Sequence, residues 1–311
     1  MLAAAALELQ GQASDVSTEV RIDRFTSFRL GGPASILIEP ATETRLAAVG
    51  LTLASYGIDI LILGRGTNVL VSDEGFKGAV IRLTKAFEWI RDEPPFVVAG
   101  GAVPLPQVSN WAARRSFSGL EFAVAIPATV GGSVKMNAGA HGSDVSEVLE
   151  SAVICHLTRG ELDVMSAEQM QMSYRQTNLG ADDIVCSARF KLAQAKPEKI
   201  GLLMERYRSH RSETQPIEAR NAGSMFRNPP GMSAGALIEA SGLKGFQHGG
   251  AEVSAKHANF FIAESSATAQ DVYNLMVHVQ SAVREATQVL LIPEVRLVGH
   301  FDETLGQLAI A

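Results

Sequence analysis

The sequence predicts an α+β fold built from more than one domain. Its 311 residues exceed the roughly 100–200 residues of one typical domain. Hydrophobic residues make up 46% and charged residues 19%, which is a globular composition rather than a disordered one. Segments with apolar residues at helical spacing are interspersed with short apolar runs that are typical of strands. This mixture favours an α+β enzyme whose ligands bind at the seams between domains.

The predicted elements fall into three regions between a lead-in and a tail. The first region mixes strands with a helix, the second is dominated by strands, and the third contains most of the helices. We expect strands at residues 35–39, 59–63, 79–83, 96–99, 151–155 and 183–190. We expect helices at residues 43–55, 108–115, 199–212, 234–241 and 269–287. The expected divisions are a loose or helical lead-in at 1–16, regions at 17–80, 81–200 and 201–300, and a tail at 301–311.

Local patterns justify these elements. The helix at 43–55 has Leu46, Val49 and Leu53 on one face, and the next strand is a buried apolar run that stops at Gly64. The helix at 234–241 ends at a glycine that serves as a C-cap.

Charge and cysteine usage exclude several classes of function. The formal net charge is −6 and no long basic run is present, so neither nucleic acid nor an anionic membrane is an expected partner. Cys155 and Cys186 lie in separate apolar runs, which indicates buried reduced thiols and a cytoplasmic protein. The seven histidines lack the spacing of a metal site. The amino-terminal residues do not resemble a signal peptide, and no apolar run could span a membrane.

The first of four glycine-centred segments is 63–73. A strand leads into Gly64, Gly66 and other small residues, so main-chain amides there can approach an anion closely. Val69 replaces the third glycine of a dinucleotide-binding fingerprint, and the lysine of a P-loop is missing. A tight turn between two strands remains the alternative.

The second segment, 126–140, consists mainly of small residues with interspersed hydroxyl and amide groups. Such residues cannot build a core, so we expect a flat or phosphorylated ligand to pack against this backbone. A merely flexible loop is the alternative, although it would rarely retain Ile126, Val130, Val134 and Met136.

The third and fourth segments are weaker signals. Ser224 lies in a glycine-containing stretch that lacks the Gly-x-Ser-x-Gly elbow, which disfavours serine hydrolase chemistry. Lys256 and His257 precede the aromatic pair at 260–261, and by themselves they indicate a solvated turn rather than catalytic groups.

Taken together and in this order, the segments resemble the UDP-N-acetylmuramate dehydrogenases, also called UDP-N-acetylenolpyruvoylglucosamine reductases. Further motifs lie at 26–34, 174–177 and 293–296, so the resemblance covers roughly residues 20 to 300. The chain resembles the shorter type, which lacks a tyrosine-bearing insertion. Departures from the family pattern put fine affinity in doubt more than activity; they are Ala125, Ala128, Thr177, Leu179 and Ala263.

The resemblance implies an FAD-binding region of the vanillyl-alcohol-oxidase (PCMH) type in two parts, 17–80 and 81–200, followed by a substrate-binding domain at 201–300. The expected cofactors are FAD and NADPH, and no metal. The resemblance implies FAD contacts at Arg29, Gly31, Gly32, Gly64, Arg65, Gly66, Thr67, Asn68, Ser72, Ile126, Pro127, Thr129, Gly131, Gly132, Ser133, Asn137 and Gly139.

The same resemblance assigns the chemistry. The substrate, UDP-N-acetylglucosamine-enolpyruvate, would receive a hydride from reduced flavin. Arg175 and Glu294 would stabilise the resulting enolate, and Ser224 would donate a proton. Residues expected to bind the nucleotide-sugar or NADPH are Tyr174, Arg211, Asn228, Lys256, His257 and Asn259.

Two rival interpretations remain. One is an oxidase on the same fold that passes electrons to oxygen, and the other is a non-catalytic relative. The presence of Arg175, Ser224 and Glu294 argues against both. We expect a monomer.

Overall fold

The computed structural model describes residues 1–11 and 15–310. The chain forms two compact units and passes between them several times. The first unit comprises Met1–Glu19, Ser35–Arg65 and Gly78–His210. The second unit comprises Val20–Ala34, Gly66–Lys77 and Arg211–Ala311. Both units contain helices and strands, so the predicted α+β class is confirmed.

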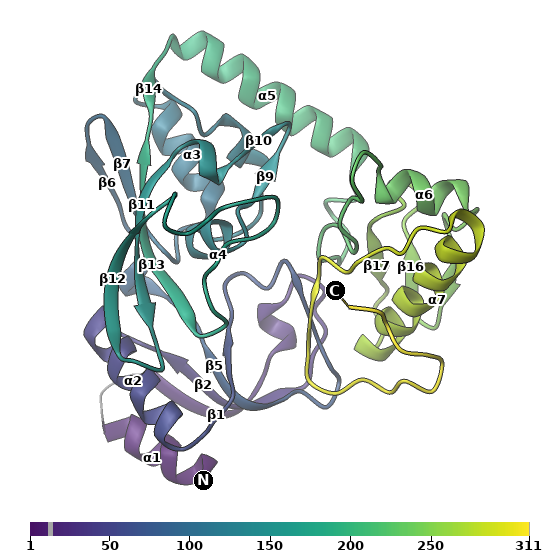
Figure 1. Ribbon diagram of the computed structural model, residues 1–311, viewed down its shortest axis with the longest axis horizontal. Helices are drawn as coiled ribbons and strands as arrows, with labels where there is room; N and C mark the ends of the chain where they lie inside the picture. The colour runs from purple at the N-terminus through teal and green to yellow at the C-terminus, as the bar shows by residue number, and fades with distance from the viewer. Residues whose placement is uncertain (12–14, 311) are drawn as a thin grey trace. The chain divides into compact units, whose positions relative to one another are not determined.

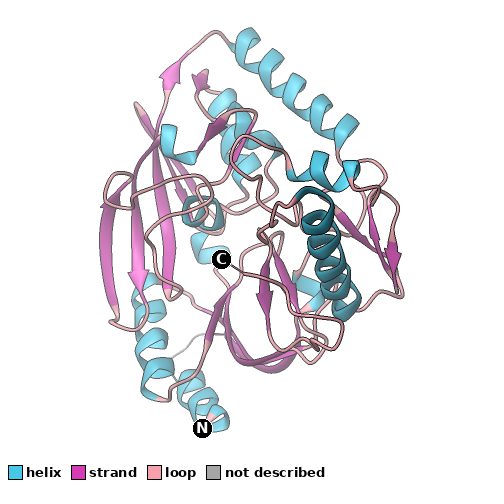
Figure 2. Ribbon diagram, turned by 45° about the vertical axis from the view of Figure 1, so that its right-hand side comes forward, coloured by secondary structure: helices cyan, strands magenta, loops and turns pink. Residues whose placement is uncertain are grey.

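The first unit contains a five-stranded antiparallel sheet, whose strands lie side by side in Figure 2. Their order across the sheet is β12-β11-β13-β7-β6. The strands are β6 (Ile90–Glu93), β7 (Phe96–Gly100), β11 (Leu149–His156), β12 (Glu161–Ser166) and β13 (Asp183–Lys191).

Both faces of the sheet are buried along the central strands β11 and β13, where neighbouring residues point to opposite faces. On β11, Ile154 joins a core shared with α3 (Leu105–Ala113), whereas Cys155 joins a core shared with α2 (Glu43–Ser55). Figure 1 shows α2 beside the sheet. The helix α1 (Leu2–Gly11) adds Leu9 to the second core.

Both cysteines are free thiols in this interior, as predicted. Burial raises the pKa of Cys155 to about 11 and also raises the pKa of Cys186. Neither thiol is therefore ionised at neutral pH, and both act as small apolar residues.

A four-stranded sheet has the order β1-β2-β5-β3, in which β3 and β5 are parallel. Its strands are β1 (Asp15–Arg21), β2 (Pro33–Glu39), β3 (Ile60–Ile62) and β5 (Phe76–Ile81). The first glycine-centred loop leaves this sheet directly after β3. Shorter elements complete the first unit; they are β8 (Phe117–Ser118), α4 (Val130–Lys135), β9 (Gly139–Ala140), β10 (Ser143–Asp144), β14 (Ala193–Gln194) and most of α5 (Pro197–Thr214).

The second unit packs two helices and a three-stranded antiparallel sheet around one core. The long helix α7 begins with a capping box, in which the side chains and amides of Thr268 and Asp271 bond reciprocally at 2.9 and 3.0 Å. The elements are β4 (Val69–Val71), α6 (Ala234–Ala240), β15 (Gln247–His248), β16 (Ala251–Val253), β17 (Phe261–Ala263), α7 (Ala269–Thr287) and β18 (Arg296–Val298).

Every predicted helix and strand is present, and α2 and α7 have the predicted ends. The helix α3 begins at Leu105 rather than 108, because proline is compatible with a first helical turn that needs no amide donor. The sequence prediction missed α4 and several strands, among them β1, β6, β12, β16 and β17. The expected divisions at residues 16, 80, 200 and 300 remain predictions.

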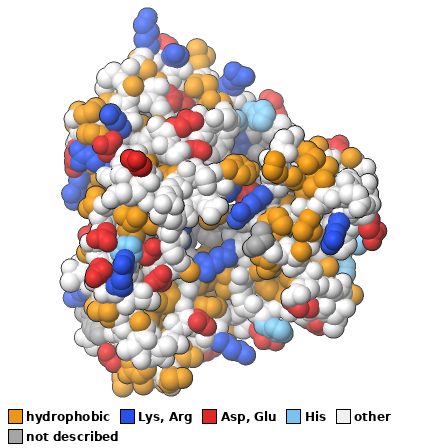
Figure 3. Space-filling model, viewed as in Figure 1, with side chains coloured by type: hydrophobic (Ala, Val, Ile, Leu, Met, Phe, Trp, Pro, Cys, Tyr) orange, Lys and Arg blue, Asp and Glu red, His pale blue; other side chains and the backbone are white. Residues whose placement is uncertain are grey.

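Among the described residues, no helix combines the length and apolarity needed to cross a bilayer. On the face shown in Figure 3, basic and acidic side chains are interspersed.

Candidate active site

The loop from Gly64 to Asn68 presents a run of unpaired main-chain amides. No described atom accepts a hydrogen bond from the N–H groups of these five residues. Gly66 is buried with a φ of +61°, and a Cβ there would lie 2.2 Å from the carbonyl oxygen of Phe25. Only glycine fits this position. Successive free amides in such a turn form an anion-binding concavity, so this loop suits a diphosphate.

Gly64 lies against Thr129, the N-cap residue of α4. A Cβ at Gly64 would lie 2.9 Å from Thr129 Oγ1, which accepts a hydrogen bond from the Gly132 amide at 3.2 Å. Two of the glycine-centred segments therefore adjoin within the first unit. The amides of residues 130–133 are all bonded inside the protein. A ligand at the start of α4 would therefore be bound by groups other than these amides.

Ser133 has the one buried hydroxyl of this segment that lacks a described hydrogen-bond partner. A buried hydroxyl left unsatisfied costs about 1–3 kcal/mol, so Ser133 is suited to a hydrogen bond with a ligand. The cofactor contacts expected at Ser133, Ile126, Pro127 and Gly139 remain predictions.

In the second unit, residues 29–32 lie beside the stretch that ends at Ser72. The Gly32 amide donates to the Ser72 carbonyl at 2.8 Å, and Arg29 has a φ of +56°. The Ser72 hydroxyl is buried and donates to the Gly75 carbonyl at 3.1 Å. The Ser72 hydroxyl therefore shapes a turn, and the predicted contact of Ser72 with the cofactor stays a prediction.

Arg175 lies in a tight turn that a buried asparagine holds in place. The main chains of Ser173 and Gln176 exchange hydrogen bonds of 2.9 and 3.1 Å, and Arg175 between them has a φ of +57°. The Asn137 side chain donates to the Ser173 carbonyl at 2.9 Å and accepts from the Ser146 amide at 3.0 Å. The amide of Asn137 therefore positions the turn, and its expected contact with the cofactor stays a prediction.

The guanidinium of Arg175 is held near the hairpin formed by β9 and β10. Its Nη2 donates to the Gly139 carbonyl at 3.0 Å. A Cβ at Gly139 would lie 2.6 Å from the Ser143 carbonyl oxygen, so the close hairpin requires glycine. The Tyr174 side chain is exposed, with its ring centre 5.3 Å from Arg175 Cζ.

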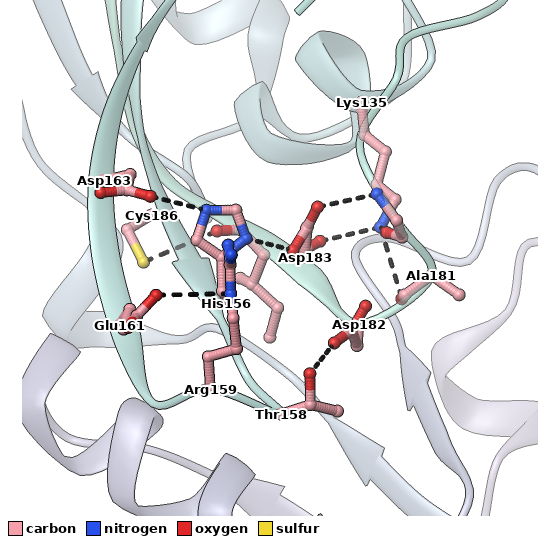
Figure 4. A network of polar contacts seen from close by, with 12 residues as sticks. Lys135, His156, Thr158, Arg159, Glu161, Asp163, Ala181, Asp182, Asp183 and Cys186 are labelled. Atoms are coloured by element: carbon pink, nitrogen blue, oxygen red, sulfur yellow. Dashed lines mark hydrogen bonds and ion pairs between the residues drawn. The ribbon is translucent and has the colours of Figure 1, made fainter.

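Lys135, the last residue of α4, ties this helix to the turn before β13 (Figure 4). Its Nζ donates to the carbonyls of Gly180 and Asp183 at 2.6 and 2.8 Å. The Asp183 carboxylate accepts from the Gly180 amide at 2.7 Å and pairs with Nδ1 of the buried His156. The other ring nitrogen of His156 lies 3.2 Å from Asp163. Sequence reasoning missed this network, because its members lie in three separate stretches without a shared motif.

Ser224 and Glu294 lie next to the same residue in the second unit. The Met225 amide donates to the Asn259 carbonyl, and the Met225 carbonyl accepts from the Glu294 amide, both at 2.8 Å. Ser224 also forms an antiparallel bridge with Phe260. The segment that carries Ser224 therefore lies between two other segments and is hydrogen-bonded to both. Glu294 belongs to one of these two segments.

Asn259 completes this framework. Its buried side chain donates to the Phe226 carbonyl at 2.8 Å and accepts from the Phe226 amide at 3.0 Å. The amide of Asn259 therefore supports the main chain of Phe226, and its expected contact with the nucleotide-sugar or NADPH stays a prediction.

The glycine-rich loop also contacts the segment that carries Glu294. Asn68 donates from Nδ2 to the Glu294 carbonyl at 3.2 Å, and its own carbonyl accepts from the Arg296 amide at 3.1 Å. The strands β4 and β18 then run in parallel from this point. The end of the loop and the Glu294 main chain are thereby fixed together.

The remaining substrate candidates have varied surroundings. Asn228 accepts from the Ala234 amide at 3.0 Å, at the start of α6. Lys256 donates from Nζ to the Ser212 carbonyl. The Nδ1 of His257 accepts from the Asn259 amide at 3.2 Å, and burial lowers the pKa of His257, so its ring is neutral.

Arg211 is a desolvated cation. Burial lowers its pKa, and its Nε is buried without a described hydrogen-bond partner. A charge removed from water is stabilised by an opposite charge, so this guanidinium suits an anionic ligand. Within the described ranges, no group of three His, Cys, Asp or Glu side chains could hold a metal ion.

Known proteins match the chain in both sequence and structure. A family model for an FAD binding domain matches residues 34–161, and a model for the C-terminal domain of UDP-N-acetylenolpyruvoylglucosamine reductase matches residues 215–298. The UDP-N-acetylenolpyruvoylglucosamine reductase 2 of Symbiobacterium thermophilum is 41% identical over 280 residues, covering 90% of this chain and 91% of its own. The Bacillus subtilis enzyme is 38% identical over 276 residues, covering 88% and 91%.

A solved structure agrees with these relatives. The crystal structure of UDP-N-acetylenolpyruvylglucosamine reductase from Thermus caldophilus superposes with a TM-score of 0.78 at 34% identity, covering 92% of this chain and 99% of that one. The resemblance read from the motifs is therefore confirmed over nearly the whole chain. The protein belongs to the UDP-N-acetylenolpyruvoylglucosamine reductase family, whose members are FAD oxidoreductases.

Proposed function

We propose that this protein uses NADPH to reduce the enolpyruvyl group of UDP-N-acetylglucosamine-enolpyruvate, giving UDP-N-acetylmuramate. The reaction would be a cytoplasmic step in the synthesis of peptidoglycan precursors, carried out by a monomer. Family membership supports the reaction, and the match to an FAD binding domain supports the cofactor.

The loop from Gly64 to Asn68 would hold the FAD diphosphate. Its five unpaired amides offer donors to phosphate oxygens without desolvating any side chain. Thr129, which lies against Gly64, would extend the same surface. FAD, once bound and reduced, would supply the hydride.

Arg175 would stabilise the negative charge that develops on the substrate carboxylate when the double bond is reduced. A guanidinium remains charged at all relevant pH values and can donate two parallel hydrogen bonds to a carboxylate. The turn held by Asn137 fixes its main chain, and the bond to the Gly139 carbonyl orients its side chain. Such preorganisation is the property that electrostatic catalysis requires.

Glu294 would hydrogen-bond the same carboxylate as its protonated acid, or stay ionised and pair with the Arg175 guanidinium. Its main chain is fixed by Met225 on one side and by the Asn68 amide on the other. The main chain that carries this acid is thus held in place.

Ser224 would deliver a proton to the substrate carbon that does not receive the hydride. A hydroxyl is a weak acid, but an enolate carbon is a strong base, so transfer is feasible at hydrogen-bonding distance. The double anchorage of the Ser224 segment supports this role, because a proton donor must be held at a defined position. The main-chain hydrogen bonds of Met225, which hold Ser224 beside the main chain of Glu294, are the observation on which the proposal depends.

Arg211 would bind a phosphate group of the nucleotide-sugar. Its desolvated guanidinium supports this assignment. Lys256, Asn228, His257 and Tyr174 are further candidates for contacts with the nucleotide-sugar or with NADPH.

The experiment is an anaerobic titration of the purified protein. NADPH should bleach the yellow flavin, and the enolpyruvyl nucleotide-sugar should then restore the colour. A protein that NADPH does not bleach, or whose colour returns only with oxygen, contradicts the proposed reaction. The second outcome would indicate an oxidase instead.

A further inference from the structure

A cavity of about 360 Å³ lies in the first unit, lined by His141, Arg206, Tyr207 and His210. Three of these residues belong to α5, and His141 comes from the hairpin formed by β9 and β10. All four side chains can donate hydrogen bonds, and none carries a negative charge.

The hairpin places His141 in this cavity at a conformational cost. His141 and Gly142 form its two-residue loop, and both have positive φ values, +57° and +85°. Asn-Gly, Asp-Gly and Gly-Gly are the preferred pairs for a turn of this kind. A residue other than glycine is uncommon at such a positive φ, which points to a function for the side chain of His141.

The imidazole of His141 is stacked on α5. Its ring is 4.0 Å from the Tyr207 ring at an angle of 7°, and it meets the His210 ring edge-on at 5.3 Å. Tyr207 packs in turn against the core of the first unit. The helix itself is held to α3 by a hydrogen bond of 2.8 Å from Arg208 to Asn110. These contacts hold His141 and Tyr207 in place at the surface, where Arg206 and His210 are exposed.

The charge of the wall identifies the class of ligand. Arg206 is permanently cationic, and the two imidazoles can become so. The neighbouring carboxylate on α5, Glu205, lies 3.6 Å from Arg208. A concave surface lined by groups of one sign attracts an ion of the other, and guanidinium beside imidazole suits phosphate oxygens. Two imidazoles beside a guanidinium make a poor metal site, because the fixed cation repels the ion.

The cavity is close to the proposed catalytic arginine. Gly139, which accepts the hydrogen bond from Arg175, is two residues from His141, a span of at most about 7 Å. A nucleotide bound at Arg175 could therefore place a phosphate group in the cavity. We propose that His141, Arg206, Tyr207 and His210 bind a phosphate group of a nucleotide that reacts at this enzyme.

The proposal rests on the proposed function and assigns a subsite to it. Two nucleotides could supply the phosphate: NADPH through its 2′-phosphate, or the substrate through its diphosphate. Both half-reactions are observable separately, so the source can be distinguished.

The test compares the wild-type holoenzyme with Arg206→Gln and His141→Asn. Asparagine tolerates the left-handed backbone at position 141, so the second variant removes the imidazole while retaining the turn. Arg159→Gln is the matched control, since it removes one exposed cation of the first unit, the partner of Glu161. Flavin content is measured for each protein, and then reduction by NADPH, reduction by NADH and reoxidation by the enolpyruvyl nucleotide-sugar.

Losing one charge-assisted phosphate contact should raise the concentration of nucleotide needed for half-maximal rate by about tenfold or more. An effect on NADPH that spares NADH identifies the 2′-phosphate, and an effect on the nucleotide-sugar alone identifies the diphosphate. The proposal is contradicted if the half-saturating concentrations of NADPH, NADH and the nucleotide-sugar are all unchanged. It is also contradicted if all three concentrations increase equally. A wild-type protein that fails both half-reactions instead refutes the proposed function, so the two failures are distinguishable.

Discussion

The side chain of Asn259 bonds both main-chain groups of Phe226, donating to its carbonyl at 2.8 Å and accepting from its amide at 3.0 Å. This reciprocal pair holds the segment that begins with Ser224 against the segment that ends at Phe260. A buried asparagine thus takes the place of a missing stretch of regular sheet, and its amide mimics a peptide group.

Replacing Asn259 with alanine should destabilise the protein, because two buried main-chain groups lose their partners. The expected loss in unfolding free energy is about 1–3 kcal/mol for each group. Urea unfolding measures it. Asn178→Ala is the control, since the Asn178 side chain makes one exposed hydrogen bond to the Gln169 carbonyl. Equal losses of unfolding free energy in the two variants would show that the hydrogen bonds to Phe226 contribute no more than one exposed hydrogen bond.

Asn137 plays the corresponding part for Arg175, and its replacement separates positioning from cofactor binding. Asn137→Ala removes the support of the Ser173 carbonyl, so the turn that carries Arg175 should loosen. We expect a lower kcat with the flavin absorbance per protein unchanged. Loss of flavin from the purified variant would support the expected contact of Asn137 with FAD and contradict a purely positioning role.

Arg175 itself should be needed for turnover and dispensable for FAD binding. Removing one preorganised donor to a developing negative charge typically slows the reaction by about 10²–10³-fold. Steady-state kinetics of Arg175→Ala should show this loss, whereas Arg175→Lys, which retains the charge but not the planar fork, should be affected less. A colourless Arg175→Ala protein would mean that the residue is structural.

His257 should make the protein less stable in mild acid. Burial lowers its pKa, whereas in the unfolded chain it titrates near 6.5. When the pH falls through about 6.5 towards the folded pKa, the unfolded state binds the proton first. This contribution to the unfolding free energy is therefore fully present above about pH 6.5, and it is lost as the pH falls towards the pKa of the folded state.

Urea unfolding at several pH values between about 7.5 and 5.5 measures this effect. His257→Gln should show a smaller decrease in unfolding free energy than the wild type. The exposed His278 provides the control, and His278→Gln should retain the wild-type slope. A His257→Gln slope as steep as that of the wild type would contradict the assignment.

The sequence predicted the elements of this fold well, since most of them carry a local signal. The ends of α7 follow from a capping box and a continuous apolar face. The helix α4 carries two glycines, which weaken any helical prediction, and it is held by Thr129 at its start and Lys135 at its end. Lys135 bonds the carbonyls of Gly180 and Asp183, and local reasoning does not detect support from residues so distant in the sequence.

The candidate site shows the same limit. The glycine-rich loop was singled out from the sequence, and the free amides of Gly64 to Asn68 suit the expected anion. The hydrogen bonds of polar side chains inside the protein were not predicted: Asn137, Asn259 and Ser72 were expected at ligands, and each also bonds the main chain. The sequence alone does not distinguish an asparagine that binds a ligand from one that hydrogen-bonds the main chain. Only the hydrogen-bond partners separate them.

The most direct test of the proposed mechanism is the rate of flavin reoxidation in Ser224→Ala, measured by stopped-flow absorbance after reduction with NADPH. The proton-donor role predicts reduction at the wild-type rate and reoxidation by the enolpyruvyl nucleotide-sugar slowed by about 10²–10⁴-fold. Ser241→Ala, in the same unit, should behave as the wild type. Reoxidation of Ser224→Ala at the wild-type rate, or an equal loss in both half-reactions, would contradict the assignment of Ser224 as the proton donor.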